Sequence, residues 1–167
     1  MTFRHTRIAA IGAAALLVTV TFAGCAGDDD ASEALTKEQF IVQADQICAQ
    51  FRADANESEI AFDAAVEEGD LDEAANLLDT HTEKMNVAIQ EFAVLQPPEE
   101  DMETIAEFIS VSRLQLKAAN EFQVAIRAGD ETVLRAADER AGVLEDEANL
   151  IADRYGMVEC GSAGSKS

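Results

Sequence analysis

The cysteines offer the clearest chemistry in this chain of 167 residues. Cys25 ends the stretch Phe22-Ala23-Gly24-Cys25, which follows a short basic start and an uncharged, largely apolar run over residues 8–23. This order is typical of a secretory signal peptide, and the run is short for a membrane span. Small residues directly before a cysteine form a lipobox, although Phe22 stands where leucine is commoner. We therefore predict removal of residues 1–24 and attachment of a lipid to Cys25.

Acylation of Cys25 leaves one pair of cysteines, Cys48 and Cys160, which resolves the odd thiol count of an exported chain. In an oxidising compartment, two cysteines far apart in sequence favour a disulfide over a metal site or a reactive couple. The alternative is a buried free cysteine at position 48 and an exposed thiol at position 160. We predict the disulfide.

The other candidate for chemistry is a pair of possible metal ligands. His81 is the one histidine after Cys25, and Met85 stands one helical turn further on. Such a pair could bind a soft ion such as Cu(I). The alternative is that Met85 belongs to the core and His81 lies at its boundary. Two ligands alone favour the second interpretation, so the sequence predicts no metal and no cofactor.

Motifs of catalysis are missing from the sequence. There is no G-x-S-x-G elbow, CxxC, HExxH or glycine-rich phosphate loop. A di-iron bundle needs Glu-x-x-His, but Leu78 stands three residues before His81. Carboxylates are so abundant that no pair can be singled out as acid and base. We predict no catalytic residues and no enzyme activity.

The charge of the chain limits its partners. Without Arg4 and Arg7, 10 of the 12 basic residues remain against 33 acidic ones, a net charge of −23. Such a surface excludes nucleic acid as a partner and is repelled by anionic lipid. The chain has no Asp-x-Asp-x-Asp-Gly calcium loop. The run Asp28-Asp29-Asp30 lies among small residues and is typical of a tether.

The remaining chain reads as one helical domain. Residues 25–35 form a lipid-bearing linker, residues 36–161 the domain and residues 162–167 a flexible tail. No stretch alternates with period two, so no strand is predicted. We predict an all-α fold, an antiparallel up-down-up-down four-helix bundle in which the fourth helix ends beside the start of the first.

The ends of these helices carry recognisable signals. Thr36 and Gln39 form a capping box, so the first helix runs from Lys37 to about Glu68. In Gly69-Asp70 and Gly129-Asp130, the glycine is predicted to end one helix and the aspartate to cap the start of the next. Pro97-Pro98 is predicted to end the second helix. Pro98 is predicted as the first residue of the third helix, and Gly156 ends the fourth. The corner 62–70 recurs in pattern at 122–130.

Apolar residues repeat at three- and four-residue steps in all four helices, which predicts one shared core. The predicted buried positions are Phe40, Ala44, Ile47, Phe51, Phe62, Val66, Leu71, Leu78, Met85, Ile89, Phe92, Leu95, Ile105, Ile109, Leu116, Ala119, Ile126, Leu134, Ala137, Ala141, Leu144, Ala148, Ile151 and Tyr155. A polar waist over residues 52–59 offers only Ala53 and Ala55. It is predicted to stay helical, with a kink or a ligand pocket as alternative meanings.

Two motifs frame the domain. The start contains Phe40-Ile41-x-x-Ala44-Asp45-x-Ile47-Cys48, and the finish reads Tyr155-Gly156-x-x-x-Cys160-Gly161. This pair resembles small exported, often lipid-anchored proteins of actinobacteria that combine an F-I-x-x-A-D-x-I-C start with a Y-G-x-x-x-C-G finish. The resemblance implies a compact helical domain with the two motif cysteines paired, and it implies no activity.

These observations predict a non-catalytic protein on the extracytoplasmic face of the cell membrane, anchored by a lipid on Cys25. It is expected to bind an envelope protein or a small ligand through its acidic surface. The alternative from another class is an extracytoplasmic carrier of a copper-type metal that uses His81 and Met85.

Overall fold

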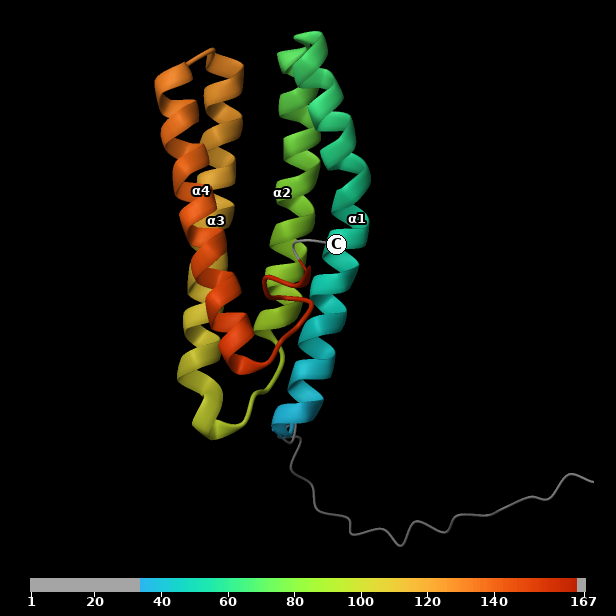
Figure 1. Ribbon diagram of the computed structural model, residues 1–167, viewed down its shortest axis with the longest axis vertical. Helices are drawn as coiled ribbons and strands as arrows, with labels where there is room; N and C mark the ends of the chain where they lie inside the picture. Colours follow the sequence, from blue (N-terminus) through green and yellow to red (C-terminus); the bar gives the residue numbers. More distant parts are fainter. Residues whose placement is uncertain (1–33, 165–167) are drawn as a thin grey trace, which may run out of the picture. The chain divides into compact units, whose positions relative to one another are not determined.

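Helices dominate the computed structural model, which describes residues 34–164. They are α1 (Lys37–Glu68), α2 (Leu71–Ala93), α3 (Met102–Ala128) and α4 (Glu131–Tyr155), with a short 3₁₀ turn, η1 (Glu99–Asp101), before α3. The described part of the chain contains no strand. The predicted all-α four-helix bundle is confirmed (Figure 1). Cys25, the predicted signal peptide 1–24 and residues 25–33 of the linker lie outside the described residues.

The predicted caps begin the helices. Thr36 Oγ1 accepts a hydrogen bond from the Gln39 amide, and Gln39 Oε1 accepts one from the Thr36 amide, which completes the capping box. Asp70 Oδ1 accepts from the Glu73 amide at 3.0 Å. Gly69 has φ 76° and Gly129 has φ 65°, a left-handed conformation that side chains disfavour. These glycines therefore allow the tight reversals between α1 and α2 and between α3 and α4.

Three predictions near the helix ends were wrong, one of a helix start and two of burial. Pro98 is not the first residue of the third helix: its backbone is extended (ψ 147°), and η1 comes before α3. Val66 and Leu71 were predicted to be buried but are 45% and 47% exposed. Both lie beside the turn at Gly69, and the buried residue of α1 nearest to that turn is the small Ala65.

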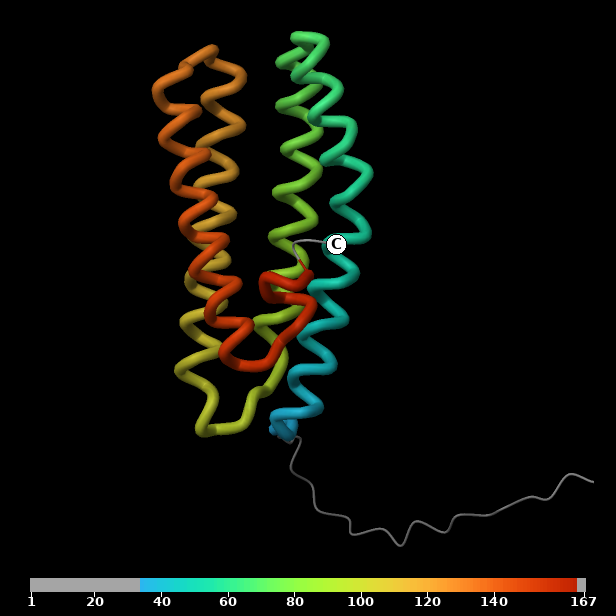
Figure 2. Tube along the Cα trace, in the orientation of Figure 1, coloured from blue at the N-terminus to red at the C-terminus, as the bar shows by residue number. Residues whose placement is uncertain are grey.

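Consecutive helices pack closely, α1 on α2, α2 on α3 and α3 on α4. The chain reverses direction at each connection (Figure 1). Helices α1 and α4 make no comparable contact. Residues 156–164, here called the C-terminal strap, instead run from the end of α4 to α1 (Figure 2). The fourth side of the bundle is therefore closed in part by the strap.

The buried core lies at the end where the strap crosses. Phe40 is fully buried, and its ring meets the rings of Phe92 and Tyr155 edge-on, at 5.7 and 5.8 Å between centroids. Met157 of the strap is also fully buried. The end of the fourth helix therefore lies beside the start of the first, as the sequence predicted. No helix among residues 34–164 is long and apolar enough to cross a membrane.

Candidate functional site: a cavity between the helices

A disulfide joins the strap to α1. Cys48 and Cys160 are bonded, with their Cα atoms 5.2 Å apart, and the predicted pairing is confirmed. Asp45, one turn earlier on α1, accepts hydrogen bonds from three consecutive strap amides, those of Val158 (3.1 Å), Glu159 (2.8 Å) and Cys160 (3.2 Å). One carboxylate therefore accepts from three consecutive backbone N–H groups of the strap, which lie beyond the end of α4 and outside any helix.

The strap continues past Gly161 in a fixed path. Ser162 donates from its hydroxyl to Asp153 Oδ2 (2.7 Å) and from its amide to Asp153 Oδ1 (3.1 Å), and Gly164 is buried. A Cβ at Gly164 would collide with the Arg52 guanidinium. Residues 162–164, predicted as the start of a flexible tail, are thus packed against the bundle.

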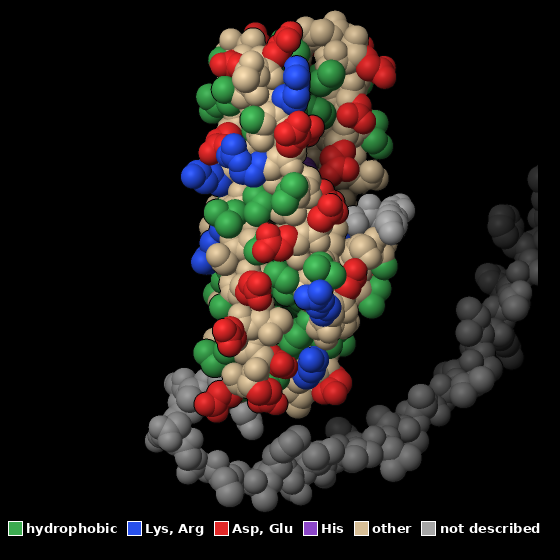
Figure 3. Space-filling view, turned by 60° about the vertical axis from the view of Figure 1, so that its left-hand side comes forward, with side chains coloured by type: hydrophobic (Ala, Val, Ile, Leu, Met, Phe, Trp, Pro, Cys, Tyr) green, Lys and Arg blue, Asp and Glu red, His purple; other side chains and the backbone are tan. Residues whose placement is uncertain are grey.

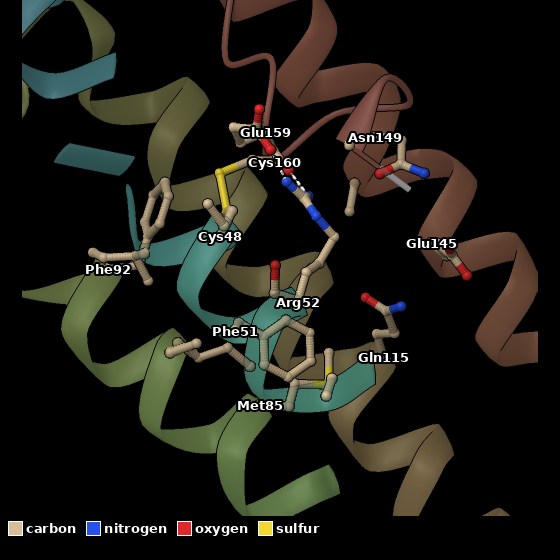
Figure 4. A pocket seen from close by; sticks show the side chains of 18 of the residues that line it. Cys48, Phe51, Arg52, Met85, Phe92, Gln115, Glu145, Asn149, Glu159 and Cys160 are labelled. Atoms are coloured by element: carbon tan, nitrogen blue, oxygen red, sulfur yellow. Dashed lines mark hydrogen bonds and ion pairs between the residues drawn. A yellow bond between two sulfur atoms is a disulfide. The ribbon is translucent and has the colours of Figure 1, made fainter. Parts of the chain in front are cut away.

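A cavity of about 650 Å³ opens above the strap, lined by all four helices and by the strap itself (Figure 4). This volume falls in the range of small-molecule sites. The floor is apolar and is formed by Ile47, Phe51, Met85, Ile89, Phe92, Phe108 and Ile109. The cavity lies where α1 and α4 do not pack on each other as the consecutive helices do.

Polar side chains also line the cavity. Arg52 and Asn56 come from α1, Gln115 from α3, and Asn149 and Glu145 from α4 (Figure 4). The guanidinium of Arg52 donates to the backbone carbonyl of Glu159 and to its carboxylate. The side-chain amides of Gln115 and Asn149 make no hydrogen bond to another residue among residues 34–164. They are therefore available to a bound molecule.

His81 lies at one edge of the cavity. Its ring meets Phe51 edge-on at 5.4 Å between centroids. Burial lowers the pKa of His81, the Glu59 carboxylate opposes this, and Lys84 adds to it. The imidazole is therefore neutral at neutral pH.

The structure brings both predicted metal candidates to the cavity, because Met85 also lines it and is buried. Residues 34–164 contain no group of three or more His, Cys, Asp or Glu side chains placed to hold a metal ion. The pair thus has two soft or borderline donors, neutral imidazole and thioether, without a recognisable third.

Sequence reasoning found part of this site. The polar waist 52–59 was noted as a possible pocket lining, and α1 runs through it as one continuous helix with Arg52, Asn56 and Glu59 at the cavity. The contributions of Gln115, Glu145 and Asn149 were missed. Asn149 directly follows core residue Ala148, but a polar residue at such a boundary has no special signature in one sequence. Only the packing of four helices assembles these side chains.

The acidic side chains do not gather in a single patch on the face shown in Figure 3. Several basic residues lie between them, and Arg127 pairs with Asp79 at 2.6 Å. The acidic residues therefore mark no single binding patch on this face. No protein family, curated protein or solved structure matches this chain. Its function must be argued from the geometry of the cavity.

Proposed function

We propose that this protein is a non-catalytic, lipid-anchored binding protein on the extracytoplasmic face of the cell membrane, and that it holds a small ligand in the central cavity. The observation that carries the proposal is the cavity of about 650 Å³, with an apolar floor and unpaired amides at its rim. Apolar surface supplies binding free energy, and a few placed polar groups supply orientation. The strap supports a rigid site, since a disulfide and Asp45 fix it to α1.

The cavity can be tested with a neutral apolar fluorophore, N-phenyl-1-naphthylamine, added to the purified protein. We expect its fluorescence to rise on binding. Ala88 is half-buried and lines the cavity, whereas its neighbour Val87 is 49% exposed and does not. Ala88→Trp should abolish the signal by filling the cavity, and Val87→Trp should retain it. A signal unchanged in Ala88→Trp, with the helical circular dichroism intact, would place binding elsewhere.

Anchorage is a separate part of the proposal. The lipobox before Cys25 supports it, because a thioether-linked diacylglycerol holds an exported protein at the membrane. Cys25→Ser should move the protein from the membrane fraction to the soluble exported fraction. A variant that stays in the membrane fraction after a high-salt wash would overturn lipid anchorage and leave the cavity proposal standing.

The second candidate is a metal carrier, favoured by the position of His81 and Met85 on one wall of the cavity. Native mass spectrometry after exposure to Cu(I) tests it directly. Copper that stays bound to the wild type and is lost in His81→Ala would establish the carrier.

An envelope protein remains the alternative to a small ligand, and cross-linking on the native cell surface would capture it.

A further inference from the structure

We propose that the cavity selects an apolar molecule that carries a protonated amine. This inference rests on the proposed function, because it names the class of ligand that the same cavity takes. The proposal follows from the charged side chains that line the cavity. The only cation among them is already paired, and two of the carboxylates are not.

The one cationic side chain in the cavity is already satisfied. Arg52 pairs with the carboxylate of Glu159 and also donates to the backbone carbonyl of that residue. An anionic ligand would have to displace a carboxylate that belongs to the disulfide-tied strap. Its charge would also face the field of a chain with a formal net charge of −21. The lining therefore disfavours a carboxylate or phosphate.

Two carboxylates of the lining remain without a cation. Glu59 on α1 and Glu145 on α4 form no ion pair within the described part of the chain. Half-buried His81 beside Glu59 does not compensate the charge of that carboxylate at neutral pH, because its imidazole is neutral there. With Arg52 cancelled by Glu159, the lining carries two formal negative charges, one on each of the helices that face each other across the cavity.

The neutral polar groups fit the same ligand. An ammonium group has three N–H donors and no acceptor, so it requires acceptors only. The side-chain carbonyls of Gln115 and Asn149, which line the cavity, can provide such acceptors. The apolar part of the ligand would lie on Phe51, Met85 and Ile89, where it removes hydrocarbon from water. The amine and the apolar body therefore have separate places in one cavity.

Three probes with the same alkyl chain and different head groups test the proposal: decylammonium, decanol and decanoate. Each is titrated below its micelle concentration against the wild type loaded with N-phenyl-1-naphthylamine. We expect decylammonium to displace the fluorophore roughly five-fold more tightly than decanol, since each partly exposed ion pair contributes a modest amount. Decanoate should be the weakest.

A pair of double variants separates the local carboxylates from the overall charge. Glu59→Gln with Glu145→Gln changes the cavity, whereas Glu57→Gln with Glu147→Gln makes the same charge change on the same two helices at exposed positions outside it. Only the first double variant should lower the affinity for decylammonium to about the affinity for decanol. The affinity for decanol itself should be the same in both double variants as in the wild type.

Equal affinity of the wild type for decylammonium and decanol would overturn the selection for an amine while leaving a small-molecule cavity. Tightest binding of decanoate, lost in Arg52→Gln, would replace it with an anion site. An equal loss in both double variants would assign the effect to net charge and overturn the role of Glu59 and Glu145. Failure of all three probes and of the neutral fluorophore would overturn the cavity function itself.

Discussion

The two ends of the bundle bury different kinds of residue. At the disulfide end, defined here by residues 35–48, 92–111 and 148–161, most of the buried residues are large and lie in one cluster that includes Phe40, Phe92, Phe108, Tyr155 and Met157. At the hairpin end, defined by residues 58–82 and 118–137, most buried apolar residues are alanines, namely Ala65, Ala74, Ala75, Ala118, Ala125 and Ala137. The cavity is lined largely by residues of the disulfide end and of the middle of the helices, with Glu59 and His81 from the hairpin end.

At the hairpin end, polar side chains add contacts between α2 and α3. Gln123 is buried, and its amide donates to the Ala75 carbonyl at 3.3 Å and to the Asp79 carboxylate. Arg127 pairs with the other oxygen of Asp79 at 2.6 Å. Alanines let neighbouring helices approach closely, and the polar contacts join α2 to α3. Large apolar residues at the disulfide end instead connect all four helices. The comparison therefore indicates that stability is concentrated at the disulfide end.

The largest expected effect breaks the covalent tie. Replacing Cys48 and Cys160 together by serine opens a loop with a sequence separation of 112 residues. The loop-entropy relation gives a loss of about 4 to 5 kcal/mol in the free energy of unfolding, so the melting temperature should fall steeply. The helical circular dichroism should persist at low temperature. A melting temperature close to that of the wild type would show that noncovalent contacts alone hold the disulfide end.

Matched phenylalanines compare the two ends directly. Phe40 is fully buried at the disulfide end, whereas Phe62 is half-buried at the hairpin end, 6.4 Å from Phe122 between ring centroids. Phe40→Ala should cost about 3 to 5 kcal/mol, and Phe62→Ala about 1 to 2 kcal/mol, because less apolar area is lost. Denaturant titration measures both. Equal losses would contradict the concentration of stability at the disulfide end.

Asp45 tests the noncovalent attachment of the strap. Asp45→Ala removes the acceptor of the three amides at residues 158–160, and should cost about 1 to 3 kcal/mol. Hydrogen exchange should accelerate at these amides while the disulfide remains. Asp45→Asn, which keeps one oxygen, should show a smaller change. Unchanged exchange at residues 158–160 in Asp45→Ala would show that the disulfide alone fixes the strap.

The smallest expected effect is a pH dependence that arises at the edge of the cavity. Burial is the main cause that lowers the pKa of His81 in the folded protein below the unfolded value of 6.5. The unfolded state then binds the proton more readily, so this contribution to stability is complete above pH 6.5 and is lost as the pH falls through the lowered folded pKa. Melting temperatures should therefore decline less toward acid pH in His81→Gln than in the wild type. An identical decline would contradict the burial of the imidazole.

The sequence by itself determined the helices and the disulfide. Caps at Thr36 and Asp70 and stops at Gly69 and Gly129 are local signals, because each depends on hydrogen bonds or backbone angles within a few residues. The pairing of Cys48 with Cys160 was likewise predicted from the cysteine count, which does not depend on the fold. These features could be predicted since their physics is local or covalent.

Tertiary structure alone decided what lies across the fold. The sequence shows Asp45 inside the starting motif but not that it holds the finishing motif through three amides. It shows a polar waist at Arg52 but not that α1 and α4 stay apart there and that a cavity lies between the helices. Hydrophobic periodicity specifies which face of a helix is buried, and it does not specify how closely two such faces approach. That distance is set by the packing of side chains from all four helices with the strap, and it decides whether a ligand has room.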